Sequence, residues 1–387
     1  MLKIYWLNAI YPLISNYEKS KIMTIEENNM RERLANILAV FKIHEHIIGY
    51  EEVQMGHINT TYRVYVKLDN GELKSYIVQK LNTFVFNNPK AVMKNIDLVT
   101  SYIRQISPKQ ALHFHHTPDG KNYYVEENNF WRLYTYKEGN AIEGNINEEV
   151  MYQCGKAFGQ FQKQLDGFDA SKLTEIIPDF HNTTKRYQHL LETIAYDPLD
   201  RVENCKEEIK FVIETKEIVL ELDALRAIGE IPLRTTHNDT KTNNVLLDAT
   251  TNEPLTVIDL DTVMPGLIMH DFGDAIRYGA NTAVEDEKDL SKVSLSLPIY
   301  EAFTKGFMEQ VKDILTPKEV DCMALGAATI TFELAVRFLD DYLAGDKYFK
   351  ISYPEHNLVR AKCQFALLKD MLKHLDEMKE IVYKYAK

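Results

Sequence analysis

The sequence predicts an α+β protein of two lobes: a small N-terminal lobe built on an antiparallel sheet and a large, mainly helical C-terminal lobe. Three observations predict it. Short runs of β-branched and aromatic residues dominate residues 47–136, and long helical periodicities follow Asn147. A polar loop and hairpin, residues 233–262, interrupts the helical part. We therefore expect an N-terminal extension at 1–24, a lobe at 25–136 and a larger lobe at 137–387.

The N-terminal lobe is expected to begin with a helix, because Leu34, Ile37, Leu38 and Phe41 follow helical spacing. Three strand-like runs come next: IIGYEEVQM, TYRVYVKL and LKSYIVQKL. Asp69-Asn70-Gly71 separates the second run from the third and indicates a tight hairpin, because Asn and Gly tolerate positive φ. A helix, KAVMKNIDLVTSYIRQI, precedes two more strand candidates, ALHFHHTPDG and KNYYVEENNFWRLYTYKEG. The chain then turns polar at Lys137, where we place a hinge.

The C-terminal lobe is expected to be a helical body. Met151, Cys154, Phe158 and Leu165 lie on one face of an amphipathic helix. Further long periodic segments occupy 205–228, 297–314, 317–344 and 357–386. No internal repeat is visible, which favours one two-lobed unit.

Composition limits the classes of function. The chain has 387 residues, 45% of them hydrophobic, and a net charge of −12. It can bury a large core, and its charge argues against a nucleic-acid or anionic-membrane surface. No uninterrupted apolar stretch is long enough to span a bilayer, and Asn8 and Pro12 interrupt the apolar run near the N-terminus, which makes a poor signal peptide. The four cysteines lie far apart, which favours buried thiols in a reducing compartment. We expect a cytoplasmic monomer with a natural start nearer Met23.

The segment HNDTKTNN has the H-x-D-x-x-x-x-N spacing of a kinase-type catalytic loop. Asp239 can accept a hydroxyl proton, while Asn244 and Asp259 offer the oxygen ligands that Mg²⁺ prefers. Alternatively, such residues in a polar loop could be turn formers. The runs 245–247 and 255–258, joined by a polar turn, favour the first interpretation, because a hairpin would bring Asn244 near Asp259. The sequence therefore predicts phosphoryl transfer by a protein-kinase-like fold.

The loop QMGHINTTYRV is expected to cover nucleotide phosphates. Gly56 allows close approach of the backbone, and Asn59 and Thr60 add hydrogen-bond donors. The same residues could form a plain turn between strands. Lys80 ends the third strand in IVQKLN, as the lysine of V-A-I-K does, and could reach the phosphates of ATP.

The following helix has no glutamate to pair with Lys80, only Asp97 and Asn95, so the lysine's partner is left open. At the hinge, we expect backbone groups around Thr135 and Tyr136 to hold adenine.

These segments resemble the aminoglycoside phosphotransferase and choline kinase family, and within it the bacterial N-acetylhexosamine 1-kinases. The resemblance runs from about Ile48 to the C-terminus. It is carried by GHINTTY, THNDTKTNN, IDLDTVMPG, DFGDAIR, TAVEDEKDLSKV, RFLDDYLAGDKYF and YPEHNLVR.

The resemblance implies roles for individual residues. Asp239 would be the catalytic base, Asn244 and Asp259 the Mg²⁺ ligands, and Asp271 a structural aspartate behind the loop. His57, Arg337 and Tyr348 would bind the sugar, together with Asp239, and His181 and Arg186 are weaker candidates. Without the resemblance, His57 could be a turn residue, Arg337 could pair with Asp340 or Asp341, and Tyr348 could be a core aromatic residue.

The implied activity is ATP- and Mg²⁺-dependent phosphorylation of the anomeric hydroxyl of an N-acetylhexosamine. Two alternatives stay open. The acceptor could be choline, an aminoglycoside or another sugar, or the chain could be a pseudokinase that binds nucleotide without turnover. All three expectations involve small molecules and no nucleic acid or membrane.

Overall fold

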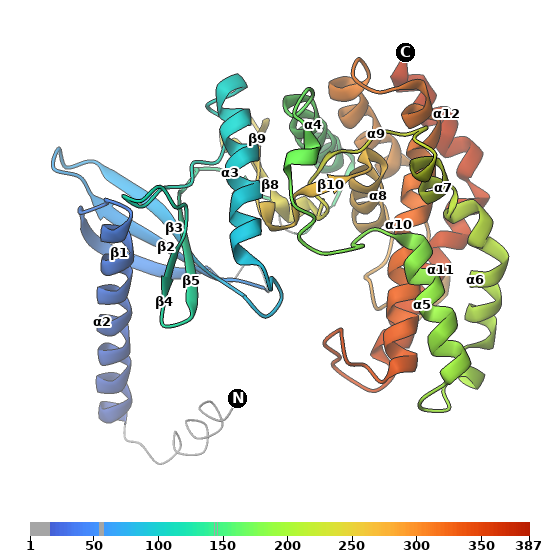
Figure 1. Cartoon of the computed structure of the whole chain (residues 1–387), viewed down its shortest axis with the longest axis horizontal. Helices are drawn as coiled ribbons and strands as arrows, with labels where there is room; N and C mark the ends of the chain where they lie inside the picture. The colour runs from blue at the N-terminus through green and yellow to red at the C-terminus, as the bar shows by residue number, and fades with distance from the viewer. Residues whose placement is uncertain (1–15, 54–57, 143, 145) are drawn as a thin grey trace. The chain divides into compact units, whose positions relative to one another are not determined.

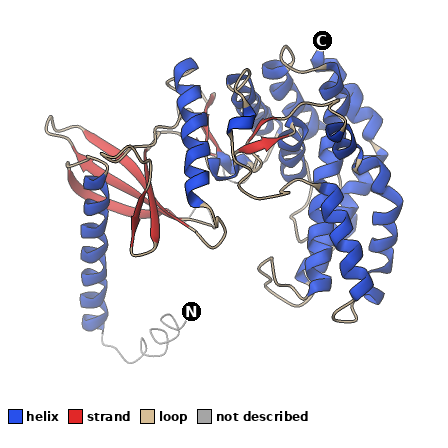
Figure 2. Cartoon of the chain, viewed as in Figure 1, coloured by secondary structure: helices blue, strands red, loops and turns tan. Residues whose placement is uncertain are grey.

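The structure is a computed structural model that describes residues 16–53, 58–142, 144 and 146–387. The chain divides into two compact units, Met1–Pro89 with Leu112–Lys137 and Lys90–Ala111 with Glu138–Lys387. The first unit holds an antiparallel sheet and the second is mostly helical, which confirms the predicted fold class (Figure 2). The division differs from the predicted boundary in one segment, because residues 90–111 group with the second unit.

The first unit is a five-stranded antiparallel sheet covered by one helix, α2 (Figure 1). The strand order is β1-β2-β3-β5-β4. Helix α2 (Asn16–Val40) contributes Leu34, Ile37 and Leu38 to a core that it shares with Val64 and Trp131 of the sheet. The strands are β1 (His46–Val53), β2 (Thr60–Lys67), β3 (Leu73–Leu81), β4 (Tyr124–Glu126) and β5 (Asn129–Thr135).

Turn chemistry explains the hairpins of this sheet. Gly71 has φ of 85° in the β2–β3 turn and donates to the carbonyl of Leu68, as the Asp-Asn-Gly signal predicted. The run ALHFHHTPDG, expected to be a strand, forms only an isolated bridge between Phe114 and Tyr134. The run after it splits into β4 and β5, because Glu127 and Asn128 both adopt positive φ and reverse the chain.

The second unit packs its helices around α10 (Pro317–Ala344), which contacts α5, α8, α11 and α12. Three short hairpin strands, β8 (Val245–Leu247), β9 (Pro254–Val257) and β6 (Asn140–Ala141), form one sheet, and β7 (Arg234–Thr236) pairs with β10 (Met264–Gly266). The other helices are α3 (Pro89–Ile106), α4 (Glu148–Gln164), α5 (Thr183–Tyr196), α6 (Lys206–Val219), α7 (Glu221–Ala227), α8 (Ile268–Gly279), α9 (Leu297–Val311), α11 (His356–Lys373) and α12 (Leu375–Ala386).

Glycines allow two helix pairs in this unit to approach closely. A Cβ atom at Gly155 of α4 would lie 2.2 Å from the carbonyl oxygen of Phe303 on α9. A Cβ atom at Gly273 of α8 would lie 2.3 Å from the carbonyl oxygen of Gly326 on α10. Both separations are too short for any side chain. The second contact sets α8, which carries Asp271 and Asp274, against the central helix.

Helix α10 is long and apolar enough, by length and composition, to cross a membrane. Its most apolar window is 89% buried inside the structure, as in the core helix of a soluble protein. Glu333 and Arg337 interrupt the apolar sequence of this helix. The apolar character of α10 is explained by its central position in the second unit.

The four cysteines, Cys154, Cys205, Cys322 and Cys363, are all buried and free, as their sequence spacing predicted. Burial raises the pKa of Cys154 to about 12 and that of Cys205 to about 11. Thiols with such pKa values are poor nucleophiles at neutral pH.

Candidate active site

The loop between β7 and β8 is shaped by the side chain of His237. Its Nε2 lies 2.9 Å from the carbonyl oxygen of Ile258, and its Nδ1 lies 3.3 Å from the backbone nitrogen of Asp239. The carbonyl requires a donor and the N–H requires an acceptor, so the network assigns a neutral imidazole protonated on Nε2. His237 therefore ties the backbone at Asp239 to the strand that leads to Asp259.

Asp271 of α8 holds the loop from behind. Its carboxylate accepts hydrogen bonds from the backbone N–H groups of His237 and Asn238, both at 2.8 Å, and from Gln162 Nε2 at 2.7 Å. Burial raises the pKa of Asp271, while the three donors and His237 oppose that rise. Asn238 takes a left-handed conformation with φ of 64°. These contacts agree with the role of a structural aspartate.

A second carboxylate, Asp274, supports the same loop one helical turn further along α8. It accepts from the backbone N–H of Thr240 at 2.9 Å and is paired with the guanidinium of Arg277 at 2.9 Å. Although burial opposes it, the positive charges of Arg277 and Lys241 lower the pKa of Asp274. Our sequence analysis missed Asp274, although it lies three positions from both Asp271 and Arg277 in DFGDAIR, a spacing that makes neighbours on a helix surface.

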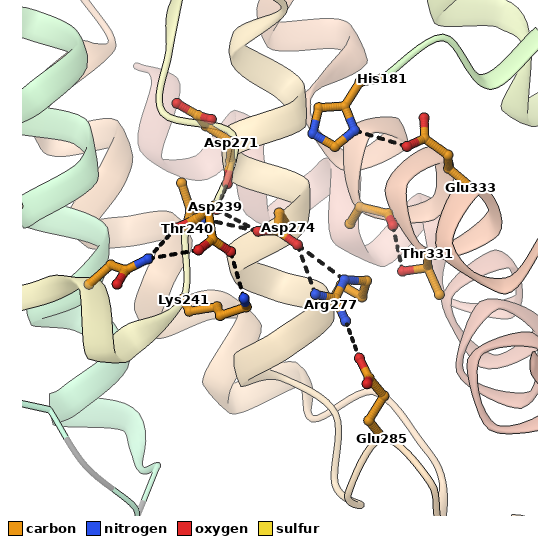
Figure 3. Close-up of polar contacts among 12 residues, drawn as sticks. His181, Asp239, Thr240, Lys241, Asp271, Asp274, Arg277, Glu285, Thr331 and Glu333 are labelled. Carbon is orange, nitrogen blue, oxygen red and sulfur yellow. Dashed lines mark hydrogen bonds and ion pairs between the residues drawn. The ribbon is translucent and has the colours of Figure 1, made fainter. Parts of the chain in front are cut away.

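The carboxylate of Asp239 is held at both oxygens (Figure 3). Lys241 Nζ lies 2.7 Å from Oδ1, and Asn244 Nδ2 donates to Oδ2 at 3.1 Å and to the Asp239 carbonyl at 2.9 Å. The Asp239 side chain is still 26% exposed. Asp239 is thus oriented and accessible, as a base that receives a hydroxyl proton must be.

The β8–β9 hairpin brings the neighbourhood of Asp259 to Asn244. Val245 pairs with Val257, and the backbone N–H of Ile258 donates to the carbonyl of Asn244 at 2.9 Å. Asp259 follows directly, with φ of 60°. The two residues are fifteen positions apart in sequence, and the predicted hairpin joins them.

The donor set suits a divalent cation of the magnesium type. The hydrogen bonds from the Asn244 amide to Asp239 both use Nδ2, so Oδ1 is turned away from Asp239. Mg²⁺ commonly takes one or two protein oxygens and completes its shell with water and phosphate. Within the described part of the chain, no group of three or more His, Cys, Asp and Glu side chains could hold a metal ion. A pair such as Asn244 and Asp259 would therefore need ligands from a bound nucleotide.

The residues predicted to bind nucleotide lie in the first unit. Gly56 and His57 fall outside the described residues. Asn59 Oδ1 accepts from the backbone N–H of Asn82 at 3.0 Å, and Thr60 is the cross-strand partner of Lys80. The sheet thus brings Thr60 and Lys80 together.

Asn95, considered above as a partner for Lys80, is used elsewhere. Its amide nitrogen donates to the carbonyls of Thr174 and Val263, both at 2.8 Å, and its Oδ1 accepts from the Thr174 N–H. It is fully buried. Asn95 therefore ties α3 to the rest of the second unit.

At the end of β5, the backbone donors are already engaged. The N–H of Thr135 donates to His113 at 3.0 Å, and the N–H of Tyr136 donates to Ser75 at 3.1 Å. The guanidinium of Arg63 stacks over the ring of Tyr136 at 3.7 Å. The backbone N–H groups of Thr135 and Tyr136 are therefore already used within the protein.

Arg337 and Tyr348 lie together at the C-terminal end of α10. Arg337 Nη2 is 3.4 Å from the Tyr348 hydroxyl, and its guanidinium also lies over the rings of Phe180 and Phe349. Tyr348 is 72% exposed, so it is not a core aromatic residue. The Asp341 carboxylate accepts from the backbone N–H groups of residues 347–349 and positions their loop.

Arg337 does not form the ion pairs considered as alternatives. Asp340 instead contacts His189 at 2.7 Å and Thr193, and Asp341 is occupied by the loop. Among the described residues, Arg337 has no carboxylate within ion-pair distance. The structure therefore brings together two of the three predicted sugar residues and leaves the third, His57, undescribed.

A buried carboxylate, Glu333, lies one turn before Arg337 on α10. Glu333 is 2% exposed and accepts from His181 Nδ1 and Thr183 Oγ1, both at 3.0 Å. Figure 3 shows the other nitrogen of the His181 ring pointing away from Glu333. Sequence reasoning missed Glu333, since its neighbours in sequence are apolar.

Part of the chain matches a known protein family in sequence. A sequence model described as the phosphotransferase enzyme family (APH) matches residues 50–291, more than half of the chain. The chain belongs to this family. Because the matched region ends before α9, it includes Asp239, Asn244 and Asp259 but not Glu333, Arg337 or Tyr348.

Solved structures of similar fold are phosphotransferases and kinases for small molecules. Spectinomycin phosphotransferase in complex with ADP and spectinomycin has a TM-score of 0.52 and 14% identity, covering 89% of this chain and 98% of that one. Choline kinase from Cryptosporidium parvum has a TM-score of 0.54 and 12% identity, and the match covers 94% of this chain and 99% of that one. Amicoumacin kinase in complex with AMP-PNP and Ca²⁺ has a TM-score of 0.51 and 13% identity, and the match covers 93% of this chain and 96% of that one.

At such identities the likeness extends to the fold alone. The phosphotransferase family assignment therefore rests on the sequence match, and the two-lobed fold on both. The chain is thus a member of the phosphotransferase enzyme family, and it has the fold of these kinases.

Proposed function

We propose that this phosphotransferase uses ATP and Mg²⁺ to phosphorylate the anomeric hydroxyl of N-acetylhexosamines, giving N-acetylhexosamine 1-phosphates. The observation that carries the phosphoryl-transfer part is the Asp239 carboxylate, held by Lys241 and Asn244 beside the hairpin that presents Asp259. The acceptor part rests on the sequence resemblance and on the Arg337–Tyr348 pair.

The chain's residues act on the acceptor hydroxyl. Asp239 orients the C1 hydroxyl and receives its proton as the new O–P bond forms. The bond between the γ-phosphorus and the β–γ bridging oxygen breaks at the same time, and ADP leaves. A late proton transfer suits a carboxylate, because the anomeric hydroxyl is more acidic than other sugar hydroxyls.

Asn244 and Asp259 would hold the metal, with the remaining ligands from phosphates and water. A bound divalent cation neutralises charge on the β- and γ-phosphoryl oxygens. Lys80 and Thr60, paired across β2 and β3, would contribute to phosphate binding from the first unit. Gly56 and Asn59 belong to the same proposed nucleotide loop.

Arg337 favours an acceptor rich in oxygen over a cationic one. A guanidinium donates to hydroxyl, carbonyl and carboxylate oxygens and repels an ammonium group. The exposed ring of Tyr348, whose centroid is 5.6 Å from the Arg337 guanidinium, adds an aromatic surface of the kind that sugars pack on. His57 would complete this set by resemblance.

A sugar panel tests the proposal. The protein is incubated with ATP, Mg²⁺ and N-acetylglucosamine, N-acetylgalactosamine, glucosamine, glucose or galactose, and ³¹P NMR locates the new phosphate. We expect a phosphate on O1 of the N-acetylated sugars. Phosphate on O6, or no turnover of any sugar, would reject this function.

A second candidate is a kinase for a cationic alcohol. It is favoured by the fold likeness to choline kinase and spectinomycin phosphotransferase. Adding choline, ethanolamine and spectinomycin to the panel tests it, and turnover of one of these with none of the sugars would establish it. A pseudokinase would bind ATP and turn over nothing, although Asp239, Asn244 and Asp259 are all present.

We also propose that the protein works as a cytoplasmic monomer. Buried free thiols are compatible with a reducing compartment. Light scattering after size-exclusion chromatography measures the mass in solution, and a dimer mass at micromolar concentration would contradict this part. Fractionation of cells that produce the protein tests the compartment.

A further inference from the structure

Arg186 of α5 and Arg337 of α10 each lie about one helical turn after a residue of the Thr183–Glu333 hydrogen bond, which is 3.0 Å long. Arg186 of α5 is half-buried, and its Nε is buried without a hydrogen-bond partner among the described residues. Its Nη2 donates to the carbonyl of Asp179 at 3.3 Å. Among the described residues, Arg337 of α10 is hydrogen-bonded only to the Tyr348 hydroxyl. Most of the N–H donors of both guanidinium groups therefore lack a protein acceptor.

The charges of the two side chains are under-compensated. Burial and the charge of Arg337 lower the pKa of Arg186, while Glu333 and Asp179 act in the opposite direction. Glu333 is already hydrogen-bonded to His181 and Thr183. One engaged carboxylate thus faces two cations.

The remaining acidic residues of this region are committed to other partners. Asp179 is paired with Lys185 at 2.7 Å. Asp340 contacts His189 and Thr193, and Asp341 holds the loop at residues 347–349. The buried Nε of Arg186 is costly to leave without an acceptor, because it has lost water without gaining a partner. An incoming group that supplies oxygen acceptors would remove that cost.

This cluster also lies on the catalytic side of the second unit. His181, bonded to Glu333, lowers the pKa of Asp274, and Asp274 accepts the backbone N–H of Thr240 beside Asp239. Figure 3 shows His181 and Glu333 in the same close-up as Asp239, Lys241 and Asp274. Helix α10, which carries Glu333 and Arg337, packs on α8, and Asp271 and Asp274 of α8 hold the loop of Asp239.

We infer that Arg186 and Arg337 form a two-guanidinium subsite that binds a strongly hydrogen-bond-accepting oxygen group on the acceptor, either an amide carbonyl or a carboxylate. Arg186 is then a residue that determines specificity. The inference rests on the proposed function and deepens it. Planar guanidinium groups bind such oxygens in bidentate fashion and disfavour an ammonium group at the same position.

Paired substrates separate the two oxygen sources. N-acetylglucosamine against glucosamine isolates the acetamide, and glucuronic acid against glucose isolates the carboxylate, since all four have a free anomeric hydroxyl. The ratio of kcat/KM within each pair is measured for the natural sequence, Arg186→Gln, Arg186→Lys and the neighbouring control Lys185→Gln. Lys185 is an exposed residue of the same helix.

We expect Arg186→Gln to lower at least one ratio by about 10- to 100-fold through the KM of the sugar, leaving the KM for ATP unchanged. Arg186→Lys should lower the ratio less than Arg186→Gln does, because the ammonium group keeps the positive charge but cannot form the two parallel hydrogen bonds of a guanidinium. If only the ratio of N-acetylglucosamine to glucosamine changes, the subsite binds the amide carbonyl. If only the ratio of glucuronic acid to glucose changes, it binds the carboxylate. Equal ratios in Arg186→Gln and Lys185→Gln would overturn the inference.

Failure of the proposed function would look different. If the natural sequence phosphorylates none of these sugars, that function fails, and the subsite is tested by calorimetric titration with N-acetylglucosamine and sodium glucuronate. Tighter binding of either ligand to the natural sequence than to Arg186→Gln would still support the subsite. Absence of any difference between the two proteins would reject it.

Discussion

Lys241 Nζ lies 2.7 Å from Oδ1 of Asp239, and the ion pair fixes one oxygen of the base while Asn244 fixes the other. Lys241 is two residues after Asp239 in the same loop, so the contact is local in sequence. Asp239 raises the pKa of Lys241 despite the opposing effect of burial, and the lysine therefore keeps its charge at neutral pH.

Replacing Lys241 should affect turnover more than binding. Lys241→Ala releases Oδ1 of Asp239, and we expect kcat to fall by up to about 100-fold, because a small misplacement of a catalytic group has that effect. The KM values for sugar and ATP should change little. Lys241→Arg, which retains the charge, should keep more activity than Lys241→Ala. Steady-state kinetics check this, and a larger effect on the sugar KM than on kcat would contradict it.

Removal of the base should abolish catalysis without preventing nucleotide binding. Asp239→Asn keeps the shape of the side chain but cannot accept the hydroxyl proton, so we expect kcat to fall by about 100-fold or more. Calorimetry with an ATP analogue should give an unchanged Kd. Asp248→Asn is the matched control, since Asp248 only accepts backbone N–H groups in the exposed turn between β8 and β9.

Activity should require a divalent cation held by Asp259. EDTA should abolish turnover, and added Mg²⁺ should restore it. Asp259→Asn should raise the Mg²⁺ concentration for half-maximal activity by roughly tenfold or more. Asp289→Asn, in an exposed turn where Asp289 bonds Ser291, should leave that concentration unchanged. An unaltered Mg²⁺ dependence in Asp259→Asn would remove this residue from the metal site.

Loss of Arg337 should weaken binding of the acceptor and leave binding of ATP unchanged. Arg337→Ala removes the donors next to Tyr348, so we expect the KM for the sugar to rise by about tenfold or more. The KM for ATP is the internal control and should not move. If the sugar KM is unaffected, Arg337 does not bind the acceptor.

His270 should make folding stability depend on pH. Burial and His181 lower its pKa from 6.5 to about 3, and neither ring nitrogen has a partner among the described residues. Below pH 6.5 the unfolded chain binds a proton at His270 that the folded chain does not. Stability from this group is therefore full above pH 6.5 and is lost as pH falls toward 3.

The free energy of unfolding should thus drop by about 2 kcal/mol between pH 7 and pH 5 on account of His270. His270→Phe keeps an aromatic ring without titratable nitrogens, and its stability should vary less over that interval. Urea unfolding at several pH values measures the difference. His189→Asn, at an exposed histidine, provides the comparison, and equal pH slopes for His270→Phe and the natural sequence would contradict the prediction.

Local sequence patterns predicted the turns and hairpins whose contacts join residues close in sequence. The Asp69-Asn70-Gly71 turn follows from the backbone freedom of Asn and Gly, and the catalytic loop from the spacing of Asp239 and Asn244. The hairpin that carries Asp259 follows from two apolar runs around a polar turn. The segment ALHFHHTPDG, which we expected to be a strand, forms only an isolated bridge, because its pairing with β5 is limited to Phe114 and Tyr134.

The sequence by itself determined the two-lobed α+β class and the phosphotransferase family, and it predicted Asp239 as base with Asn244 and Asp259 as metal ligands, since these depend on short-range spacing and hydrophobic periodicity. Only the tertiary structure decided which charges meet. Glu333 binds His181 from 152 positions away, and Arg186 comes near Arg337 because α5 packs on α10. Such long-range pairs depend on how helices pack, which leaves no periodic signal in the sequence, and they are the contacts that we propose select the acceptor.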